Sequence, residues 1–239
     1  MCGIFAYLGS QISFEDIMKN FEKIQKRGPD NSLVHFLDDK VFFGFHRLSI
    51  NDVSEKGNQP LYHANDRNLV LICNGEIYNH KKLVEDNGFE TYSNSDCEVI
   101  LHLYQKYGIR DTINMLDGVF AFVLYDGNEN IVYAGRDPFG VRPMFMGKRN
   151  ISKQEGDILE LHKMEIIFSS EIKGISDISD KIEPFKPGNY WDSKTQEYTE
   201  YYGYKYPHPT NQLVPNETNM EVIYSNVNRL LTEAVDKRL

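Results

Sequence analysis

Short apolar runs separated by turn residues limit the folds open to this chain more than any other sequence feature. Residues 33–37 and 41–48 form one predicted β-hairpin, and residues 119–125 and 131–134 form another across Asp126-Gly127-Asn128. Further strands are predicted at residues 4–8, 69–73, 144–146, 166–168, 184–188 and 198–204. Strands in groups, with helices between the groups, predict an α+β fold with stacked sheets and not a wound βαβ sheet.

Helices are predicted where apolar residues recur at intervals of three or four. A short helix is expected at residues 77–84, after Asn74-Gly75 has turned the chain at the end of the preceding strand. A longer helix is expected at residues 95–107, where Ser95 and Glu98 have the spacing of a capping box. The polar stretch that follows the strand at 144–146 is expected to be a variable loop or hairpin.

The C-terminal part of the chain is expected to be separate from the rest. Residues 2–205 are predicted to form one domain, and residues 206–217 a linker. Residues 218–239 carry an apolar helical stripe with no following chain to pack on. This helix could dock back on the domain, mediate a homodimer, or begin a further domain.

Net charge and the placement of Cys and His residues exclude some classes of binding partner. A net charge of −9 and a pI near 5.3 argue against nucleic acid or an anionic membrane, because both attract clustered Lys and Arg. Cys2, Cys73 and Cys97 form no CxxC pair, and no His spacing resembles a metal site. No signal peptide or membrane span is visible, so a reducing cytoplasm is the expected location.

Cys2 is the candidate nucleophile. Aminopeptidases remove an initiator Met that precedes a small residue, so the mature chain is expected to begin with a free amine on Cys2. One residue then carries both a thiol and a base that works near neutral pH, which activates the nucleophile without a separate His. Taken alone, a Cys beside an apolar strand is more often a packing residue.

Six ordered motifs favour the catalytic alternative, because together they resemble the class II glutamine amidotransferases, which are N-terminal nucleophile hydrolases. The resemblance covers roughly residues 2–202 and is strongest to the glutaminase domain of asparagine synthetase. The motifs are Met1-Cys2-Gly3-Ile4, Arg27-Gly28-Pro29-Asp30, His46-Arg47-Leu48-Ser49-Ile50, Asn74-Gly75-Glu76-Ile77-Tyr78-Asn79, Ser95-Asp96-Cys97-Glu98-Val99-Ile100 and Arg136-Asp137-Pro138-Phe139-Gly140-Val141-Arg142-Pro143.

This resemblance implies a four-layer αββα sandwich and a glutamine-hydrolysing site. The Cys2 thiolate would attack the carboxamide of L-glutamine, and the Cys2 α-amine would move the protons. The Asn74 side chain and the Gly75 N–H would stabilise the oxyanion of the tetrahedral intermediate. Asn-Gly alone is more often a simple turn, but its place within these motifs favours the catalytic role.

The resemblance also implies residues that hold the amino-acid part of glutamine. Arg47 would bind its α-carboxylate and Asp96 its α-ammonium. Backbone groups near Leu48, Ile50 and Glu76 would assist. From the spacing alone, Arg47 could equally be an ordinary surface residue, and Asp96 could equally be an ordinary residue at the start of a helix. His46, Cys73 and Cys97 are interpreted as structural.

Two positions depart from the family pattern: Lys26 replaces a His, and Asn51 replaces an apolar residue and could alter the glutamine pocket. The chain also has no Gly-Gly, and so lacks the Ser-Gly-Gly pyrophosphate loop of a synthetase domain.

We therefore expect no cofactor here, with ATP and Mg²⁺ bound only by a synthetase domain in cis or trans that makes asparagine from aspartate. The alternative function is a non-catalytic glutamine-sensing or scaffold domain that recruits a partner through its last helix.

Overall fold

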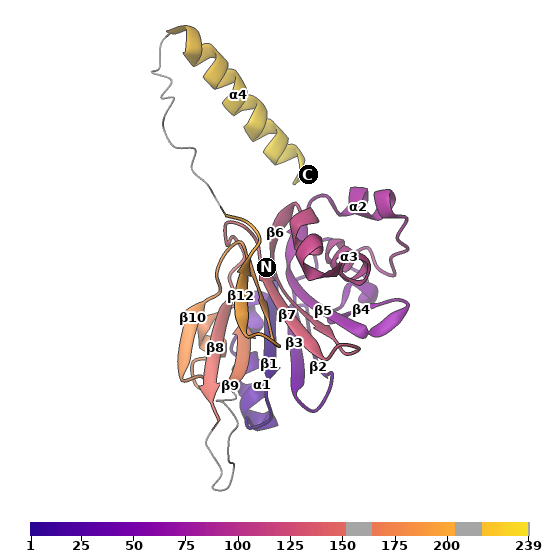
Figure 1. Ribbon diagram of the computed structural model, residues 1–239, viewed down its shortest axis with the longest axis vertical. Coiled ribbons are helices and arrows are strands. Elements are labelled where there is room, and N and C mark those ends of the chain that lie inside the picture. Colours follow the sequence, from indigo (N-terminus) through magenta and orange to yellow (C-terminus); the bar gives the residue numbers. More distant parts are fainter. Residues whose placement is uncertain (152–163, 204–216, 239) are drawn as a thin grey trace. The chain divides into compact units, whose positions relative to one another are not determined.

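The computed structural model describes residues 1–151, 164–203 and 217–238, and its chain divides into two units, Met1–Tyr202 and Gly203–Leu239. The second unit contains helix α4 (Glu217–Asp236), which begins one residue before the predicted start (Figure 1). Residues 206–216 of the predicted linker lie outside the described residues, as do residues 152–162 of the predicted loop. None of the helices within the described ranges is long and apolar enough to span a membrane.

Two antiparallel six-stranded sheets form the first unit (Figure 1). The strand orders are β10-β8-β9-β1-β3-β2 and β12-β11-β7-β6-β5-β4. The first sheet comprises β1 (Gly3–Leu8), β2 (Asn31–Phe36), β3 (Val41–Arg47), β8 (Phe145–Asn150), β9 (Met164–Ser169) and β10 (Lys181–Pro184). The second comprises β4 (Leu61–His63), β5 (Asp66–Ile77), β6 (Gly118–Asp126), β7 (Ile131–Arg136), β11 (Asn189–Asp192) and β12 (Glu197–Glu200).

Side-chain alternation along the strands builds a core on each face of both sheets. In β1, Ile4 and Ala6 enter the core between the sheets, whereas Phe5 and Tyr7 pack with residues of helix α1 (Phe14–Glu22). Ile72 of β5 likewise enters the central core, and its neighbour Leu71 packs on the helix side. Both sheets are therefore covered on two faces, which requires apolar residues at consecutive strand positions.

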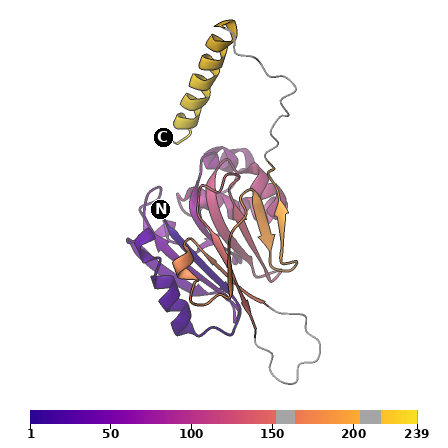
Figure 2. The ribbon, with the colours of Figure 1, turned by 90° about the vertical axis from the view of Figure 1, so that its left-hand side faces the viewer.

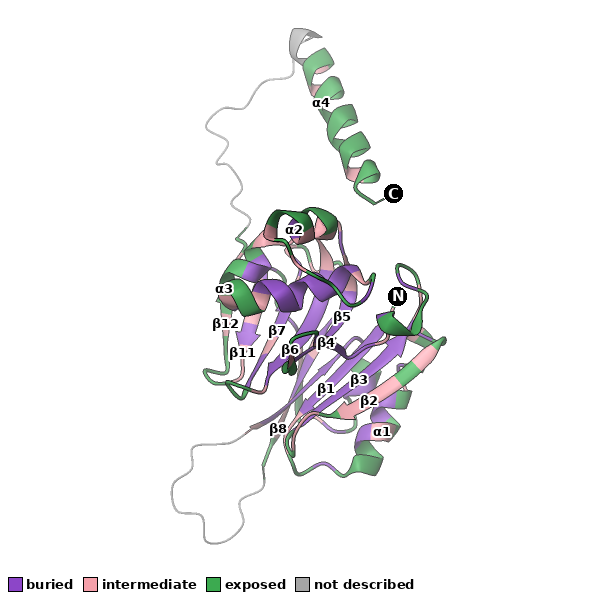
Figure 3. Cartoon of the chain, turned by 90° about the vertical axis from the view of Figure 1, so that its right-hand side faces the viewer, coloured by how far each residue is buried: buried purple, intermediate pink, exposed green. Residues whose placement is uncertain are grey.

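Helices cover the two outer faces. Helix α1 lies on the sheet that contains β1, and helices α2 (His80–Asn87) and α3 (Val99–Met115) lie on the sheet that contains β5 (Figures 2 and 3). The order of layers is helix, sheet, sheet, helix. The α+β fold with stacked sheets that the sequence predicts is thus confirmed.

One predicted turn is wrong. Strand β5 does not end before Asn74-Gly75 but runs through both residues to Ile77. Neighbouring β6 pairs with it along this stretch, with Gly75 opposite Phe120 and Ile77 opposite Gly118. Pairing within the sheet overrides the local turn preference of Asn-Gly, and helix α2 consequently starts later than predicted, at His80.

The predicted capping box at Ser95 is also wrong, because the Ser95 side chain makes no cap hydrogen bond. The buried Glu98 carboxylate instead accepts hydrogen bonds from the backbone N–H groups of Tyr92 and Ser93, at 2.7 and 2.8 Å. A 3₁₀ helix, η3 (Asp96–Glu98), precedes α3, which spans Val99–Met115 and is broken by a kink at Gly108 (φ 74°), next to the predicted end at residue 107.

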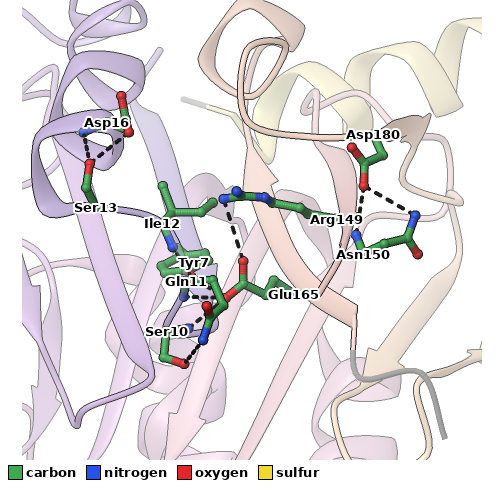
Figure 4. Close-up of polar contacts among 10 residues, drawn as sticks. All are labelled: Tyr7, Ser10, Gln11, Ile12, Ser13, Asp16, Arg149, Asn150, Glu165 and Asp180. Atoms are coloured by element: carbon green, nitrogen blue, oxygen red, sulfur yellow. Dashed lines mark hydrogen bonds and ion pairs between the residues drawn. The ribbon is translucent and has the colours of Figure 1, made fainter. Parts of the chain in front are cut away.

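A buried carboxylate fixes the chain between β1 and α1 (Figure 4). Glu165 of β9 is 2% exposed, and its Oε1 atom accepts hydrogen bonds from the Tyr7 hydroxyl at 2.6 Å and from the N–H groups of Ser10 and Gln11 at 2.8 and 2.6 Å. Charge-assisted bonds of this kind are stronger than neutral ones. Glu165 thus holds the end of β1, the strand that starts next to Cys2.

Candidate active site

One pocket of the first unit brings together residues from four separate segments of the sequence. Seven of the eight predicted site residues line it, namely Cys2, Arg47, Leu48, Ile50, Asn74, Gly75 and Asp96. Glu76 follows Gly75 on β5 and is not among the residues that line this pocket. The start of β1, the end of β3, the C-terminal part of β5 and the 3₁₀ helix η3 meet here because the two sheets are stacked.

Cys2 lies at the first residue before β1 and is only partly exposed. The N–H of Leu48 donates to its Sγ atom at 3.4 Å, and the thiol lies 3.5 Å from the Leu48 carbonyl oxygen. Burial raises the pKa of the Cys2 thiol above its ordinary value, and the hydrogen bond with Leu48 opposes part of this rise. The resting sulfur is therefore a thiol that needs a nearby base to become a nucleophile.

Arg27 fixes the backbone of Cys2, a role that the sequence interpretation did not assign. Its Nε atom donates to the Cys2 carbonyl oxygen at 2.8 Å, and its Nη1 atom lies 3.2 Å from Glu171. Next to it, a Cβ on Gly28 would collide with the His46 carbonyl, so only glycine lets this turn approach the end of β3. In the sequence, the Arg-Gly-Pro-Asp motif marks Arg27 as part of the family pattern, but it does not indicate that Arg27 contacts the Cys2 carbonyl oxygen.

Asn74 presents a free donor inside the protein. The residue is 2% exposed, and its Nδ2 atom is buried without a hydrogen-bond partner. Buried amide groups are almost always paired, so an unpaired one indicates a group reserved for another molecule. Asn74 and Cys2 line the same pocket, so the free donor and the thiol can meet the same bound molecule.

The turn predicted at Asn74-Gly75 does not explain why residue 75 is a glycine, because this residue lies within strand β5. A Cβ at this position would lie 2.8 Å from the Cβ of Phe120 and 2.9 Å from the Val119 carbonyl oxygen on β6. Close packing between β5 and β6 excludes a side chain here. The geometry therefore explains Gly75 through the sheet, in addition to any contact with a bound molecule.

Arg47 is buried in the pocket wall, and part of its guanidinium is already engaged. Its Nη1 atom donates to the Ser54 carbonyl at 2.8 Å and to Asn58 Oδ1 at 2.6 Å, and its Nη2 atom donates to the Asp52 carbonyl. A guanidinium has five N–H donors, so these three contacts leave two for a ligand. The same contacts hold the loop after β3 against the pocket.

Asp96 is the buried carboxylate of the pocket, at 4% exposure. Its Oδ2 atom accepts from the Ile77 N–H at 2.6 Å, and its Oδ1 atom accepts from the Asn51 side-chain amide at 2.9 Å. The Cys97 thiol also donates to Oδ2, at 3.8 Å. A carboxylate can accept about four hydrogen bonds, so Oδ1 retains capacity for a cationic ligand. Asn51, the departure from the family pattern that was expected to alter the pocket, also lines it.

The residues interpreted as structural are buried and paired. The His46 ring stacks on Phe21 with centroids 3.8 Å apart, and it contacts the Ser32 hydroxyl and the Phe21 carbonyl. Burial lowers the pKa of His46, so the ring stays neutral near pH 7. Cys73 and Cys97 are buried in the core between the second sheet and its helices.

The loop at residues 136–143 is held by several hydrogen bonds and reaches the pocket through Arg142. Buried Asp137 accepts backbone hydrogen bonds from Phe139, Val141 and Arg142 at 2.9–3.1 Å. Arg136 donates to three carbonyl oxygens around the same loop, each at 2.7 Å. The loop is therefore a structured element that brings Arg142 to the pocket.

Comparison with known proteins links this geometry to one family. A family model described as a glutamine amidotransferase domain matches residues 1–202. The chain is 41% identical over 210 residues to a probable glutamine-hydrolyzing asparagine synthetase of Dictyostelium discoideum, a match that covers 84% of this chain and 35% of the relative. It is 36% identical over 255 residues to the glutamine-hydrolyzing asparagine synthetase of Gallus gallus, covering 100% of this chain and 44% of that protein.

Two further comparisons agree. A probable glutamine-hydrolyzing asparagine synthetase of Acanthamoeba polyphaga mimivirus is 34% identical over 261 residues, covering 100% of this chain and 45% of the relative. The structure of glutamine phosphoribosylpyrophosphate amidotransferase from B. subtilis, complexed with ADP and GMP, is similar in fold, with a TM-score of 0.66 at 20% identity over 84% of this chain and 49% of that one. The chain spans less than half the length of each of these relatives.

Proposed function

This chain belongs to the glutamine amidotransferase domain family, and we propose that it hydrolyses L-glutamine to glutamate and ammonia through a thioester on Cys2. We further propose that the ammonia serves the ATP-dependent synthesis of asparagine from aspartate on another domain or partner chain. The names of the similar asparagine synthetases support this acceptor. The three free cysteines support a reducing cytoplasm as its location.

The proposed reaction begins with removal of Met1. Met1 lines the pocket, so its removal clears space beside the thiol and also frees the Cys2 α-amine. The amine takes the proton from the buried thiol, directly or through a water molecule, as the sulfur attacks the carboxamide carbon of glutamine. The raised pKa of the Cys2 thiol makes this proton transfer necessary near pH 7.

The carbonyl oxygen of glutamine becomes negatively charged as the carbon–sulfur bond forms. The unpaired Nδ2 donor of Asn74 and the Gly75 N–H would stabilise that charge in the transition state. The protonated amine then returns its proton to the leaving nitrogen, and ammonia departs. Water attacks the thioester next and releases glutamate and the free thiol.

Two charged side chains would hold the rest of the substrate. Arg47 has donors left for the α-carboxylate, and Asp96 has acceptor capacity left for the α-ammonium. Backbone groups of Leu48 and Ile50 line the same pocket. Opposite charges held apart by rigid segments favour a zwitterion, which is the state of a free amino acid near pH 7.

The observation that carries this proposal is the presence of Cys2 and the unpaired Asn74 amide in one pocket. A packing cysteine would explain the burial of Cys2, but it would not explain a buried amide donor left free beside it. A scaffold domain would require neither feature. Catalysed attack on a carboxamide uses both, the thiol as nucleophile and the amide as a donor to the oxyanion.

The decisive test compares ammonia release from L-glutamine by the wild type and by Cys2→Ala. We expect the variant to lose all release above the uncatalysed background, with an unchanged melting temperature. Equal rates in the two proteins would refute glutaminase activity. The intact mass of the active protein tests the amine separately, because full activity in a chain that retains Met1 would exclude the α-amine as the base.

A further inference from the structure

We propose that Asn51 is a positioning residue that makes this site selective for substrates with an α-amino group. The inference rests on the proposed glutaminase function and concerns the Asp96 end of the pocket. Asn51 would act by holding the Asp96 carboxylate in place and by offering a second acceptor beside it.

The Asn51–Asp96 contact has a definite polarity. A carboxylate only accepts hydrogen bonds, so the amide nitrogen of Asn51 must be the atom that faces Asp96 Oδ1, at 2.9 Å. The amide oxygen of Asn51 then faces away from that carboxylate oxygen. It has no hydrogen-bond partner among the described residues and remains an acceptor next to a negative charge.

Asn51 completes the immobilisation of Asp96. The Ile77 N–H, on β5, already holds the other carboxylate oxygen at 2.6 Å. With one oxygen tied to β5 and the other to the loop after β3, the carboxylate cannot rotate freely about its terminal torsion. A charged group held before binding loses less conformational entropy when the ligand arrives. An apolar residue at position 51 would leave Oδ1 without this bond.

The contact also joins two walls of the pocket. Next to Asn51, Asp52 accepts a hydrogen bond from the Asn94 N–H at 2.9 Å. Adjacent residues of one loop therefore bind both ends of the short segment 94–96. The two contacts differ in kind, because Asp52 holds backbone whereas Asn51 holds the side chain that would meet the ammonium.

The test uses Asn51→Leu, which keeps the approximate size of the side chain and removes the amide. Val53→Ser, on the same loop, serves as the matched control, because Val53 is 80% exposed and does not line the pocket. Each protein is assayed with L-glutamine and with 4-carbamoylbutanoate, which has the same carboxamide and carboxylate but no amino group.

We expect Asn51→Leu to raise KM for L-glutamine about 10-fold, the effect of losing a hydrogen bond to a charged group, with kcat within roughly twofold of wild type. For 4-carbamoylbutanoate, kcat/KM should stay within roughly twofold, so that selectivity for the amino group falls about 10-fold. If this analogue is not hydrolysed, inhibition by glutamate and by glutarate gives the same comparison.

Three results would overturn the proposal. The first is an equal loss of kcat/KM for L-glutamine and 4-carbamoylbutanoate in Asn51→Leu. The second is a fall in kcat for L-glutamine without a change in KM, and the third is no change in either constant. The melting temperature of Asn51→Leu separates a general loss of structure from a loss of selectivity. Failure of the glutaminase function itself is distinguishable, because wild type and Cys2→Ala would then release ammonia equally.

Discussion

Asn74 shows at the scale of one residue how the site and the stability of the fold oppose each other. A buried amide without a partner has lost its bonds to water and gained none from the protein, which costs about 1–3 kcal/mol. The hydrophobic cores on the two faces of the sheet that contains Asn74 offset this cost. The donor is consequently ready for a developing charge without any rearrangement.

We predict that Asn74→Leu will lower kcat by about 10² to 10³ while leaving the melting temperature equal to or above that of the wild type. Leucine is similar in size to asparagine but has no donor. Its loss of the donor therefore lowers kcat, and the removal of a buried unpaired polar group keeps or raises the melting temperature. Coupled ammonia assays and differential scanning calorimetry check the two quantities.

A matched control is Asn20→Leu in helix α1. Asn20 is equally buried, but its amide donates to the Asp16 carbonyl at 2.8 Å and its oxygen accepts from Lys23 at 2.8 Å. We expect this variant to lose about 1–2 kcal/mol of stability and no activity. A loss of stability in Asn74→Leu as large as in Asn20→Leu would contradict the interpretation of Asn74 as unpaired.

At the scale of elements, the position of each site residue depends on which strand pairs with which. Asn74 faces the pocket because β5 continues past it and pairs with β6, and not because Asn-Gly forms a turn. Cys2 depends in the same way on β1, which pairs with β3 and β9. Apolar alternation in the sequence predicts these strands individually, but it does not specify their partners.

Glu165 tests how much one buried contact contributes to the stability of the fold at the end of β1 remote from Cys2 (Figure 4). We predict that Glu165→Ala will reduce the free energy of unfolding by about 2–4 kcal/mol, because the Tyr7 hydroxyl and two backbone N–H groups lose a charged acceptor. Denaturant unfolding measures this loss. Asp180→Ala is the control in the same region, since Asp180 is exposed and accepts from the Asn150 N–H at 2.8 Å.

The control should change the free energy of unfolding by less than about 1 kcal/mol. Similar losses in the two variants would show that burial of Glu165 contributes nothing beyond an ordinary surface contact. Ammonia release measured on folded Glu165→Ala should match the wild type, because the residue acts on the far end of β1.

At the scale of the whole molecule, packing of the sheets and of the helices that cover them buries histidines in a neutral state, with His46 against Phe21 of α1 and His63 beside His102 of α3. Burial lowers the pKa of His35, His46 and His63 below the ordinary value of 6.5. The unfolded chain therefore binds protons at these residues at a higher pH than the folded chain does. Stability contributed by the neutral rings is complete above pH 6.5 and decreases as the pH falls below it.

We accordingly predict that the free energy of unfolding will fall when the pH is lowered from 7.5 to 5.5. Urea unfolding at several pH values measures this slope. His63→Gln should flatten it, because His63 is 2% exposed and its ring lies 4.5 Å from that of His102. A slope that is zero, or identical in the variant, would contradict the role of His63.

The division of the chain into two units leads to another prediction at this scale. Removal of residues 203–239 should leave one cooperative unfolding transition with a melting temperature within about 3 °C of the full chain, because the cores of the first unit draw on residues before Tyr202. Calorimetry of the two chains checks this expectation. Loss of cooperative unfolding would show that the first unit depends on α4.

The sequence by itself determined the classes of element, the α+β character and the residue types of the site, because periodicity, turn residues and ordered motifs are local properties of a chain. Only the tertiary structure decided that Asn74 lies within a strand, that Arg27 holds Cys2 and that Asn51 contacts Asp96. Arg27 and Cys2 are 25 positions apart in the sequence, and Asn51 and Asp96 are 45 positions apart. Such contacts arise from strand pairing and sheet stacking, which no local pattern encodes.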